Sequence, residues 1–243
     1  MKSYLLLEQK LHECASKGLL SPRQENNAYL KLSYKGSGGL ISDKWNVKIY
    51  TSGSVVCTDL ALLDSIVKDT LKAPDSSKKV IQIDDSGWGS PLCGVLVGLT
   101  DGTEVWTDEV DVSFFQSPLY ETKGYLEEYA RKGISILNKK GVTPSTHRIE
   151  ICTGYVNTCL KDKLRAMGYE VRVAEIKGLL QDQLETVFKN HIKEKTGKDL
   201  GYDPKECTDN RELAAKYYAM LNWGRAHAPH LLKSGWKSMK DAA

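Results

Sequence analysis

Two adjacent aspartates, Asp84 and Asp85, are the residues whose type and position point most directly to chemistry. They follow the apolar run 79–83 and precede a glycine-rich turn at 86–89. Two neighbouring carboxylates repel each other, so clustering them costs free energy unless a cation compensates their charge. Mg²⁺ and Mn²⁺ accept such oxygen ligands together with water and phosphate oxygens. The pair therefore indicates a metal site. The alternative is that Asp85 caps a turn and Asp84 accepts backbone N–H bonds.

The pattern after residue 78 predicts three consecutive strands followed by alternating helices and strands. Asp101-Gly102 is a strong hairpin signal between the second and third strands. Right-handed crossovers would place the strand at 147–152 beside the first one, in a mixed sheet with helices on both faces. The first strand is then central, and its carboxyl end is where open α/β sheets place their sites. The predicted strands are 79–83, 95–99, 103–106, 147–152 and 170–176, and the predicted helices are 120–138, 155–167 and 179–195.

The first 72 residues predict a smaller α+β domain. Apolar residues at helical spacing indicate helices at 3–16 and 59–72, and alternating patterns indicate strands at 28–34, 45–50 and 55–58. Residues 73–77 form a short turn-rich linker. We therefore expect three parts: an accessory domain at 1–75, an α/β domain at 76–200 and a basic helical C-terminal extension at 201–243.

Composition indicates an ordinary globular protein and excludes disorder along its whole length. The chain has 243 residues, of which 41% are hydrophobic and 27% charged, and its net charge is +3. That charge is too nearly balanced to imply a polyanionic partner by itself. No apolar run approaches the roughly 20 residues that span a bilayer, and the start lacks a signal-peptide pattern. The six cysteines form no C-x-x-C pair and the histidines have no metal-ligand spacing. We expect a cytoplasmic protein with reduced cysteines and no membrane segment.

A resemblance to a known family is carried by residues 83–95, which read Ile-Asp-Asp-Ser-Gly-Trp-Gly-Ser-Pro-Leu-Cys-Gly-Val. This stretch resembles the first motif of type-2 ribonucleases H, the HII and HIII enzymes. The predicted order of elements is also that of the ribonuclease H-like superfamily. Residues 45–56, which lead into an amphipathic helix, are similar to the TATA-box-binding-protein-like N-terminal domain of HIII enzymes. The resemblance implies a nuclease that uses Mg²⁺ or Mn²⁺ and acts on an RNA–DNA hybrid.

The resemblance also implies roles for the residues of the motif. Asp84 and Asp85 would hold metal, and the backbone of Gly87, Trp88 and Gly89 would approach a ribose 2′-OH, the group that distinguishes RNA from DNA. Two positions depart from the family pattern. Asp85 stands where the family has Glu, and Trp88 stands where it has Arg or Lys. Trp88 could stack on a base or sugar, or it could be a buried core residue.

The other carboxylates that the family uses are less clearly matched. Thr153 stands at the position of the third family aspartate, and a hydroxyl cannot supply its charge. Glu150 would substitute only if the strand register differs, and is otherwise a paired or edge residue. Asp182 and Glu185 lie in the region of the fourth family carboxylate, one helical turn apart. Either they complete the metal cluster or they belong to a solvated helix face.

The C-terminal residues 211–243 carry a net charge of +4 with interleaved aromatic residues. Such a mixture suits a nucleic-acid surface, with cations on phosphates and rings for stacking. Apolar residues at helical spacing equally indicate a packing helix with a basic outer face. The basic residues are Arg211, Lys216, Arg225, Lys233, Lys237 and Lys240, the aromatic residues are Tyr217, Tyr218, Trp223 and Trp236, and the apolar stripe is Leu213, Tyr217, Met220 and Leu221.

Three functions from different classes follow. The first is a metal-dependent nuclease for RNA–DNA hybrids or another structured nucleic acid, in which Asp182, Glu185 or Glu150 completes the cluster and the metal activates water. The second is a nucleic-acid-binding or scaffold protein that keeps the fold but has lost catalysis, as Thr153 indicates. The third is a protein–protein module that uses the N-terminal domain, with no salt-dependent affinity for nucleic acid.

Overall fold

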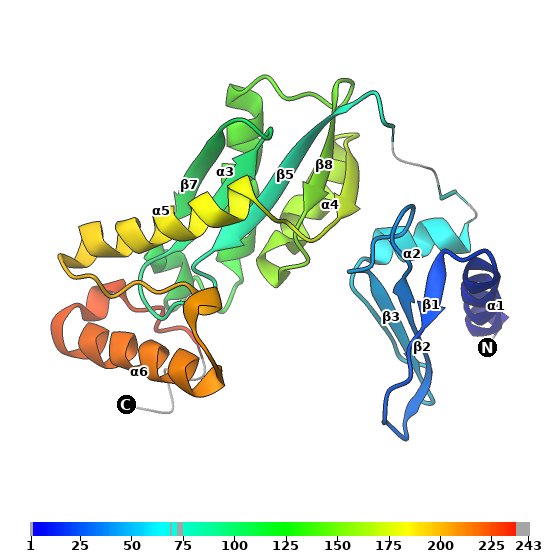
Figure 1. The fold of residues 1–243 in the computed structure, drawn as a ribbon, viewed down its shortest axis with the longest axis horizontal. Coiled ribbons are helices and arrows are strands. Elements are labelled where there is room, and N and C mark those ends of the chain that lie inside the picture. Colours follow the sequence, from blue (N-terminus) through cyan, green and yellow to red (C-terminus); the bar gives the residue numbers. More distant parts are fainter. Residues whose placement is uncertain (1, 69, 72–74, 237–243) are drawn as a thin grey trace. The chain divides into compact units, whose positions relative to one another are not determined.

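A computed structural model describes residues 2–68, 70–71 and 75–236 (Figure 1). Contacts within the chain define two units. Unit 1 comprises Met1–Ser77 with Arg172–Glu175, and unit 2 comprises Lys78–Val171 with Ile176–Ala243. The domain boundaries expected from the sequence, including a separate extension at 201–243, stay predictions. Within the described part of the chain, no helix combines the length and apolar character needed to span a membrane.

Unit 1 is a four-stranded antiparallel sheet, in the order β1-β2-β3-β4, packed against two helices. Its core joins Leu11 of the first helix and Ile66 of the second to Val47 and Ile49 of the sheet. The short strand β1 was not predicted, and α2 is shorter than expected; residues 69 and 72, at the end of the predicted helix, lie outside the described residues. The elements are α1 (Lys2–Ser16), β1 (Leu20–Pro22), β2 (Leu30–Gly36), β3 (Asn46–Tyr50), β4 (Val55–Cys57) and α2 (Leu60–Val67).

Capping fixes where α2 begins. The Asp59 side chain accepts hydrogen bonds from the backbone N–H groups of Ala61 and Leu62, which have no partner within the helix itself. The buried Trp45 indole N–H donates to the Asp59 carbonyl over 3.2 Å. The start of α2 is therefore tied to the core of the sheet.

The second sheet is five-stranded and mixed, in the order β7-β6-β5-β8-β9 with β5 in the middle (Figure 1), and it lies in unit 2 except for the last two residues of β9. β5 pairs antiparallel with β6, β6 pairs antiparallel with β7, and β5 pairs parallel with β8. The strands are β5 (Lys79–Ser86), β6 (Val95–Thr100), β7 (Val105–Val110), β8 (His147–Ile151) and β9 (Glu170–Val173). This arrangement confirms the predicted fold class, a mixed sheet with the first strand of the domain at its centre.

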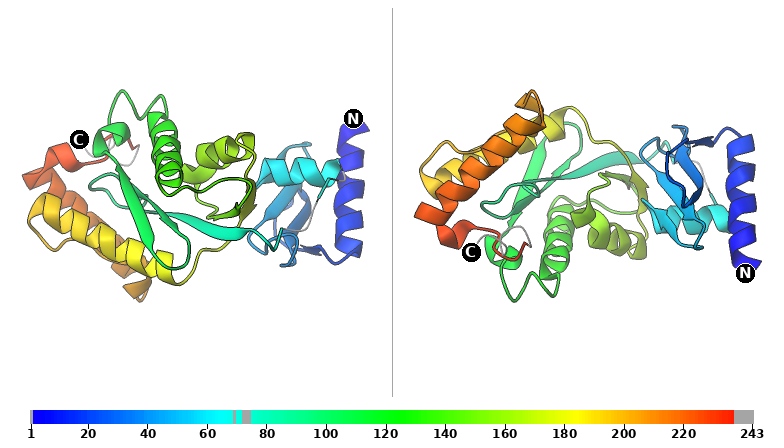
Figure 2. Two further views of the ribbon diagram at one scale, coloured as in Figure 1. Left: turned by 90° about the horizontal axis from the view of Figure 1, so that it is seen from above. Right: turned by 90° about the horizontal axis from the view of Figure 1, so that it is seen from below.

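Helices cover both faces of this sheet (Figures 1 and 2). One face packs against α5 (Leu179–Thr196), and the other packs against α3 (Gly124–Lys139), which in turn packs on α4 (Thr158–Ala166). Four short 3-10 helices connect the elements described. They are η1 (Val112–Phe115), η2 (Tyr155–Asn157), η3 (Pro204–Glu206) and η4 (Pro229–Leu231).

The central strand β5 is longer than predicted. The predicted strand stopped before the aspartate pair, which is wrong, because Asp84, Asp85 and Ser86 continue the pairing with β6. They lie opposite Gly98, Val97 and Leu96 respectively. Successive side chains on a strand point to opposite faces. Asp84 and Asp85 therefore project to opposite sides of the sheet.

The chain after residue 200 belongs to unit 2. Helix α6 (Asn210–His227) buries Met220 and Leu221 of the predicted apolar stripe, whereas Leu213 and Tyr217 are half-buried. The following segment then runs along the loop after β5, because the Cys93 N–H donates to the Leu231 carbonyl over 2.8 Å and the Lys233 N–H to the Pro91 carbonyl over 3.0 Å. Of the predicted basic surface, Lys237 and Lys240 lie outside the described residues.

Close packing of α5 on the sheet depends on Gly98. A Cβ at this position would lie 2.8 Å from the methyl carbons of Leu184, closer than carbon atoms approach. We expect Gly98→Ala to lower the free energy of unfolding by about 1–3 kcal/mol, as for other overpacked cores. Thermal unfolding measures this. Gly89→Ala is the control, because a Cβ there meets nothing within 4 Å. Equal melting temperatures for the two variants would contradict the packing argument.

Candidate functional site

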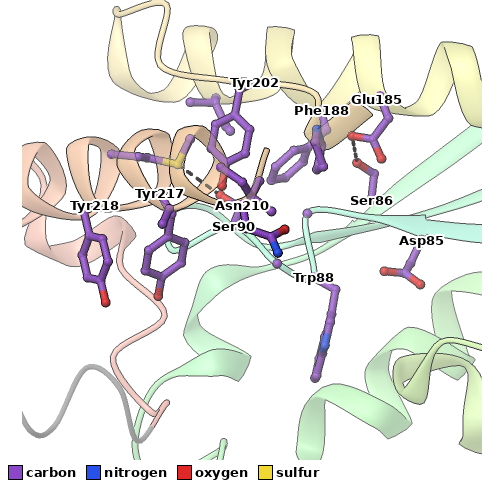
Figure 3. Close-up of a pocket in the computed structure, with 17 residues that line it drawn as sticks. Asp85, Ser86, Trp88, Ser90, Glu185, Phe188, Tyr202, Asn210, Tyr217 and Tyr218 are labelled. Carbon is purple, nitrogen blue, oxygen red and sulfur yellow. Dashed lines mark hydrogen bonds between the residues drawn. The ribbon is translucent and has the colours of Figure 1, made fainter. Parts of the chain in front are cut away.

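The acidic residues at the end of β5 are divided between the two faces of the sheet. Asp84 lies opposite Gly98, which touches Leu184, so its side chain is on the face covered by α5. Asp85 lies opposite Val97, which packs near Gly133 of α3, so it is on the other face. Figure 3 shows Asp85 and Ser86 pointing to opposite sides of the strand. The pleat of one strand thus places the two carboxylates on different faces.

On the face covered by α5, the side chain of Asp84 lies near the carboxyl end of β5, and Glu185 of α5 contacts the same end of the strand through Ser86. Asp84 is buried, and its carboxylate accepts a hydrogen bond from the Asp85 N–H over 2.9 Å. The Ser86 hydroxyl donates to the Glu185 carboxylate over 3.0 Å, which holds this residue of α5 against the strand (Figure 3). The hydrogen bond explains why Glu185, one helical turn after Asp182, faces the sheet.

Cys152 is a further residue on this face. Its N–H donates to the Ile83 carbonyl over 3.0 Å, so it continues the β8 pairing and is level with Asp84. Burial, together with the charge of Asp84, raises the pKa of the Cys152 thiol to about 12. The thiol therefore stays protonated at neutral pH. The sequence indicated only a small buried residue here, because the position of Cys152 beside Asp84 arises from strand pairing.

On the other face, Asp85 accepts a hydrogen bond from the buried Asn157 amide over 3.3 Å. A Cβ at Gly154 would lie 2.8 Å from the same Asp85 oxygen, so glycine is needed to leave room for this carboxylate. Burial, and then the negative charges of Asp84 and Glu185, raise the pKa of Asp85 to about 7. The charges of Asp84 and Glu185 thus act on Asp85 through the strand, and the nearby charge of Lys233 offsets part of their effect.

A buried lysine stabilises the loop 86–90, which follows Asp84 and Asp85. Lys233 is 0% exposed, and its ammonium donates to the carbonyls of Gly87 and Ser90, the latter over 2.9 Å. The ammonium also lies 5.2 Å from the ring centre of Phe115 and 5.3 Å from that of Trp236. Burial lowers the pKa of Lys233 to about 7. From the sequence, Lys233 was expected only as part of the basic tail; its apolar neighbours at 231–232 and 235–236 are the signal that it is buried.

Trp88 packs within an aromatic cluster. Its ring lies 5.6 to 6.2 Å from the rings of Phe115, Tyr125, Tyr155 and Trp236. Trp88 is half-buried, and Tyr155 is 48% exposed at the edge of the cluster. The structure thus shows the packing role, and a stacking role toward a ligand stays a prediction.

The remaining predicted residues lie farther from the acids. Glu150 is level with Gln82, two residues before Asp84 and hence roughly 6–7 Å back along the strand. Asp182 is exposed in the first turn of α5. Thr153, to which the resemblance assigns the position of the third family aspartate, is also exposed. Roles of Glu150 and Asp182 in a site stay predictions.

A cavity of about 560 Å³ opens beside the end of β5, which we call the tyrosine cavity (Figure 3). Its walls come from the loop 86–90, from α5, from residues 202–204 and from α6. The rings of Phe188, Tyr202, Tyr217 and Tyr218 line it, and Asp85 and Glu185 are its acidic lining residues.

The arrangement of unit 2 decides its classification. Its strands run in the order β7-β6-β5-β8-β9 with β8 parallel to β5, and helices cover both faces. The fold is ribonuclease H-like. No family model and no curated protein matches the sequence.

Similar solved structures include ribonuclease H3 from Aquifex aeolicus and a single-substitution mutant of Bst-RNase HIII. The first is 12% identical with a TM-score of 0.33, and the match covers 86% of this chain and 91% of that one. The second is 12% identical with a TM-score of 0.39, covering 96% and 95%. The classification rests on the strand order.

The ribonuclease H-like unit offers oxygen ligands for a hard cation. Within the described ranges, no group of three or more His, Cys, Asp or Glu side chains is placed to hold a metal ion. Mg²⁺ typically uses only one or two protein carboxylates and takes its other ligands from water and substrate phosphates. Asp84 and Glu185 fit such an open site. Their negative charges raise the pKa of Asp85, and a bound cation would relieve this repulsion.

Proposed function

We propose that this protein is a metal-dependent nuclease that cleaves the RNA strand of RNA–DNA hybrids or of another structured nucleic acid. The observation that carries the proposal is that Asp84 and Glu185 lie on one face at the carboxyl end of the central strand, and that their charges act on Asp85 on the other face. Their mutual repulsion favours the binding of a cation there. The tyrosine cavity beside them leaves room for a substrate.

The proposed roles follow from the two faces of the strand. Asp84 and Glu185 would hold Mg²⁺ or Mn²⁺ on the α5 side, and Ser86 would fix the orientation of Glu185. Asp85 would add negative charge from the opposite face. A bound ion of this kind neutralises phosphate charge and lowers the pKa of water, which is what phosphodiester hydrolysis requires.

The loop after the acids would contact the sugar. Gly87 adopts a φ of +88°, and its carbonyl is occupied by Lys233. Lys233 thus ties the loop at both Gly87 and Ser90, and the N–H groups between them stay available to a ligand. We assign this rigid loop to the recognition of a ribose 2′-OH, in line with the sequence resemblance.

Cleavage of a labelled RNA–DNA hybrid in Mg²⁺ or Mn²⁺ tests the proposal. The wild-type chain should cleave it, and Asp84→Asn should reduce the rate at least about 100-fold, since it removes a charge that binds the metal. The control is Asp162→Asn, an exposed change on α4 that should leave the rate unaltered. Absence of cleavage by the wild type, or equal cleavage by wild type and Asp84→Asn, would refute the proposal.

A second candidate, a nucleic-acid-binding protein without catalysis, is favoured by one observation. In the sequence resemblance, Thr153 stands at the position of the third family aspartate, where a hydroxyl supplies no charge. Calorimetry with Mn²⁺ separates the two candidates. Saturable Mn²⁺ binding that Asp84→Asn abolishes supports the nuclease. Salt-dependent hybrid binding with no Mn²⁺ binding supports the second candidate.

A further inference from the structure

We propose that the tyrosine cavity binds one unpaired nucleobase of the substrate, next to the phosphodiester that is cleaved. This inference rests on the proposed function and names its substrate more closely. The volume of about 560 Å³ lies in the range of roughly 300–1,000 Å³ that is typical of small-molecule sites. A nucleobase is the flat, neutral and aromatic part of a nucleic acid.

The walls of the cavity suit a flat ring. Phe188 of α5, Tyr202 and two tyrosines of α6 contribute aromatic faces from three separate segments (Figure 3). Aromatic stacking is worth about 1–3 kcal/mol per base and tolerates any base. Tyr218 is 59% exposed, so its ring is accessible to a ligand without a rearrangement of the fold.

The charges around the tyrosine cavity disfavour a phosphate group inside it. No lysine, arginine or histidine is found among the described residues that line the cavity. Two acidic residues line it: Glu185 on the α5 side, and Asp85, whose side chain points to the other face of the sheet. Their negative charge repels a phosphate. The cavity therefore suits a neutral ring and keeps the charged backbone outside.

The loop 86–90 lies between the acidic residues and the tyrosine cavity, so it determines where the phosphodiester lies when a base is bound. A Cβ at Gly87 would lie 2.3 Å from the Phe188 ring, so the loop backbone packs directly on the cavity wall. A base inside would thus place its own phosphate near the end of β5. A base within a continuous duplex must first be unstacked, at a cost of a few kcal/mol. Substrates with an unpaired nucleotide beside the cleaved bond are therefore favoured.

Fluorescence anisotropy with three end-labelled hybrids tests this inference on the full chain, with Ca²⁺ in place of Mg²⁺. One hybrid is fully paired, one has a single bulged adenosine in the RNA strand, and one has an abasic bulge at the same position. The wild type should bind the adenosine bulge about tenfold more tightly than the abasic one, as expected for one stacked base. Tyr217→Leu and Tyr218→Leu should reduce this ratio toward one and leave affinity for the abasic hybrid unchanged.

The control variant is Tyr29→Leu, which removes a 74% exposed tyrosine of unit 1 and should keep the ratio. Because the measured quantity is a ratio between two ligands, partial loss of folded protein does not alter it. Equal wild-type affinity for the adenosine and abasic bulges overturns the inference but leaves the proposed function standing. Failure to bind any of the three hybrids overturns both.

Discussion

Lys233→Met is expected to lower the free energy of unfolding by about 2–4 kcal/mol and the melting temperature by roughly 5–15 °C. The variant loses both hydrogen bonds from the ammonium and leaves the Gly87 and Ser90 carbonyls without that donor. Unsatisfied buried acceptors cost about 1–3 kcal/mol each. Relief from burying a charge offsets part of this loss, since burial already lowers the pKa of Lys233 to about 7.

The pH dependence of this variant gives a second readout. Between pH 7 and 10 the unfolded chain holds a proton on Lys233 that the folded chain has released. Stability therefore rises with pH through this range in the wild type. Lys233→Met should lack this rise, so its deficit relative to the wild type grows toward pH 10. Thermal unfolding at several pH values measures both effects, with exposed Lys193→Met as the control. A deficit no larger than that of Lys193→Met would contradict the assigned role.

Asp85→Asn is expected to stabilise the protein at pH 8 by on the order of 2–4 kcal/mol. The folded chain keeps a proton on Asp85 up to about pH 7, whereas the unfolded chain releases it near its ordinary value of 3.8. The folded state thus binds more protons between these values, and wild-type stability falls as pH rises from 4 to 7. The amide has no charge to bury, so the variant should lack this fall.

Denaturant unfolding in EDTA from pH 4 to 8 checks this prediction. Wild type and Asp85→Asn should have similar stability near pH 4 and diverge toward pH 8. The matched control is Asp182→Asn, because Asp182 is exposed on α5. If the free energy of unfolding of Asp85→Asn fell with pH as much as that of the wild type, the fall would have to come from a group other than Asp85.

Periodicity was sufficient to predict a mixed sheet with β5 at its centre, because β5, β6 and β8 have apolar runs whose direction follows from crossover rules. The extension of β5 through Ser86 was not predictable in the same way. Aspartate is uncommon in strands, and here pairing with β6 overrides that preference. The assignment of Asp84 and Asp85 to opposite faces depends on this extension.

Contacts between distant segments account for what the sequence did not reveal. Asp182 and Glu185 were equally plausible from spacing, and the Ser86 hydroxyl distinguishes them. Cys152 is level with Asp84 only because β8 pairs with β5. Lys233 looked like one more basic residue of a charged tail until its contacts with the loop were known. Each of these depends on tertiary packing, which local periodicity does not encode.

The contact between Lys233 and Gly87 joins residues 146 positions apart in the chain. Translation proceeds at about 5–20 residues per second, so roughly 7–30 s separate the synthesis of the two residues. During that interval a nascent chain can form most of the sheet, but the loop after β5 lacks the hydrogen bonds from Lys233. The proposed nuclease site is therefore completed only once Lys233 has been synthesised. Chains that terminate before residue 233 would contain the acidic residues, but their loop 86–90 would lack the stabilising contacts of Lys233.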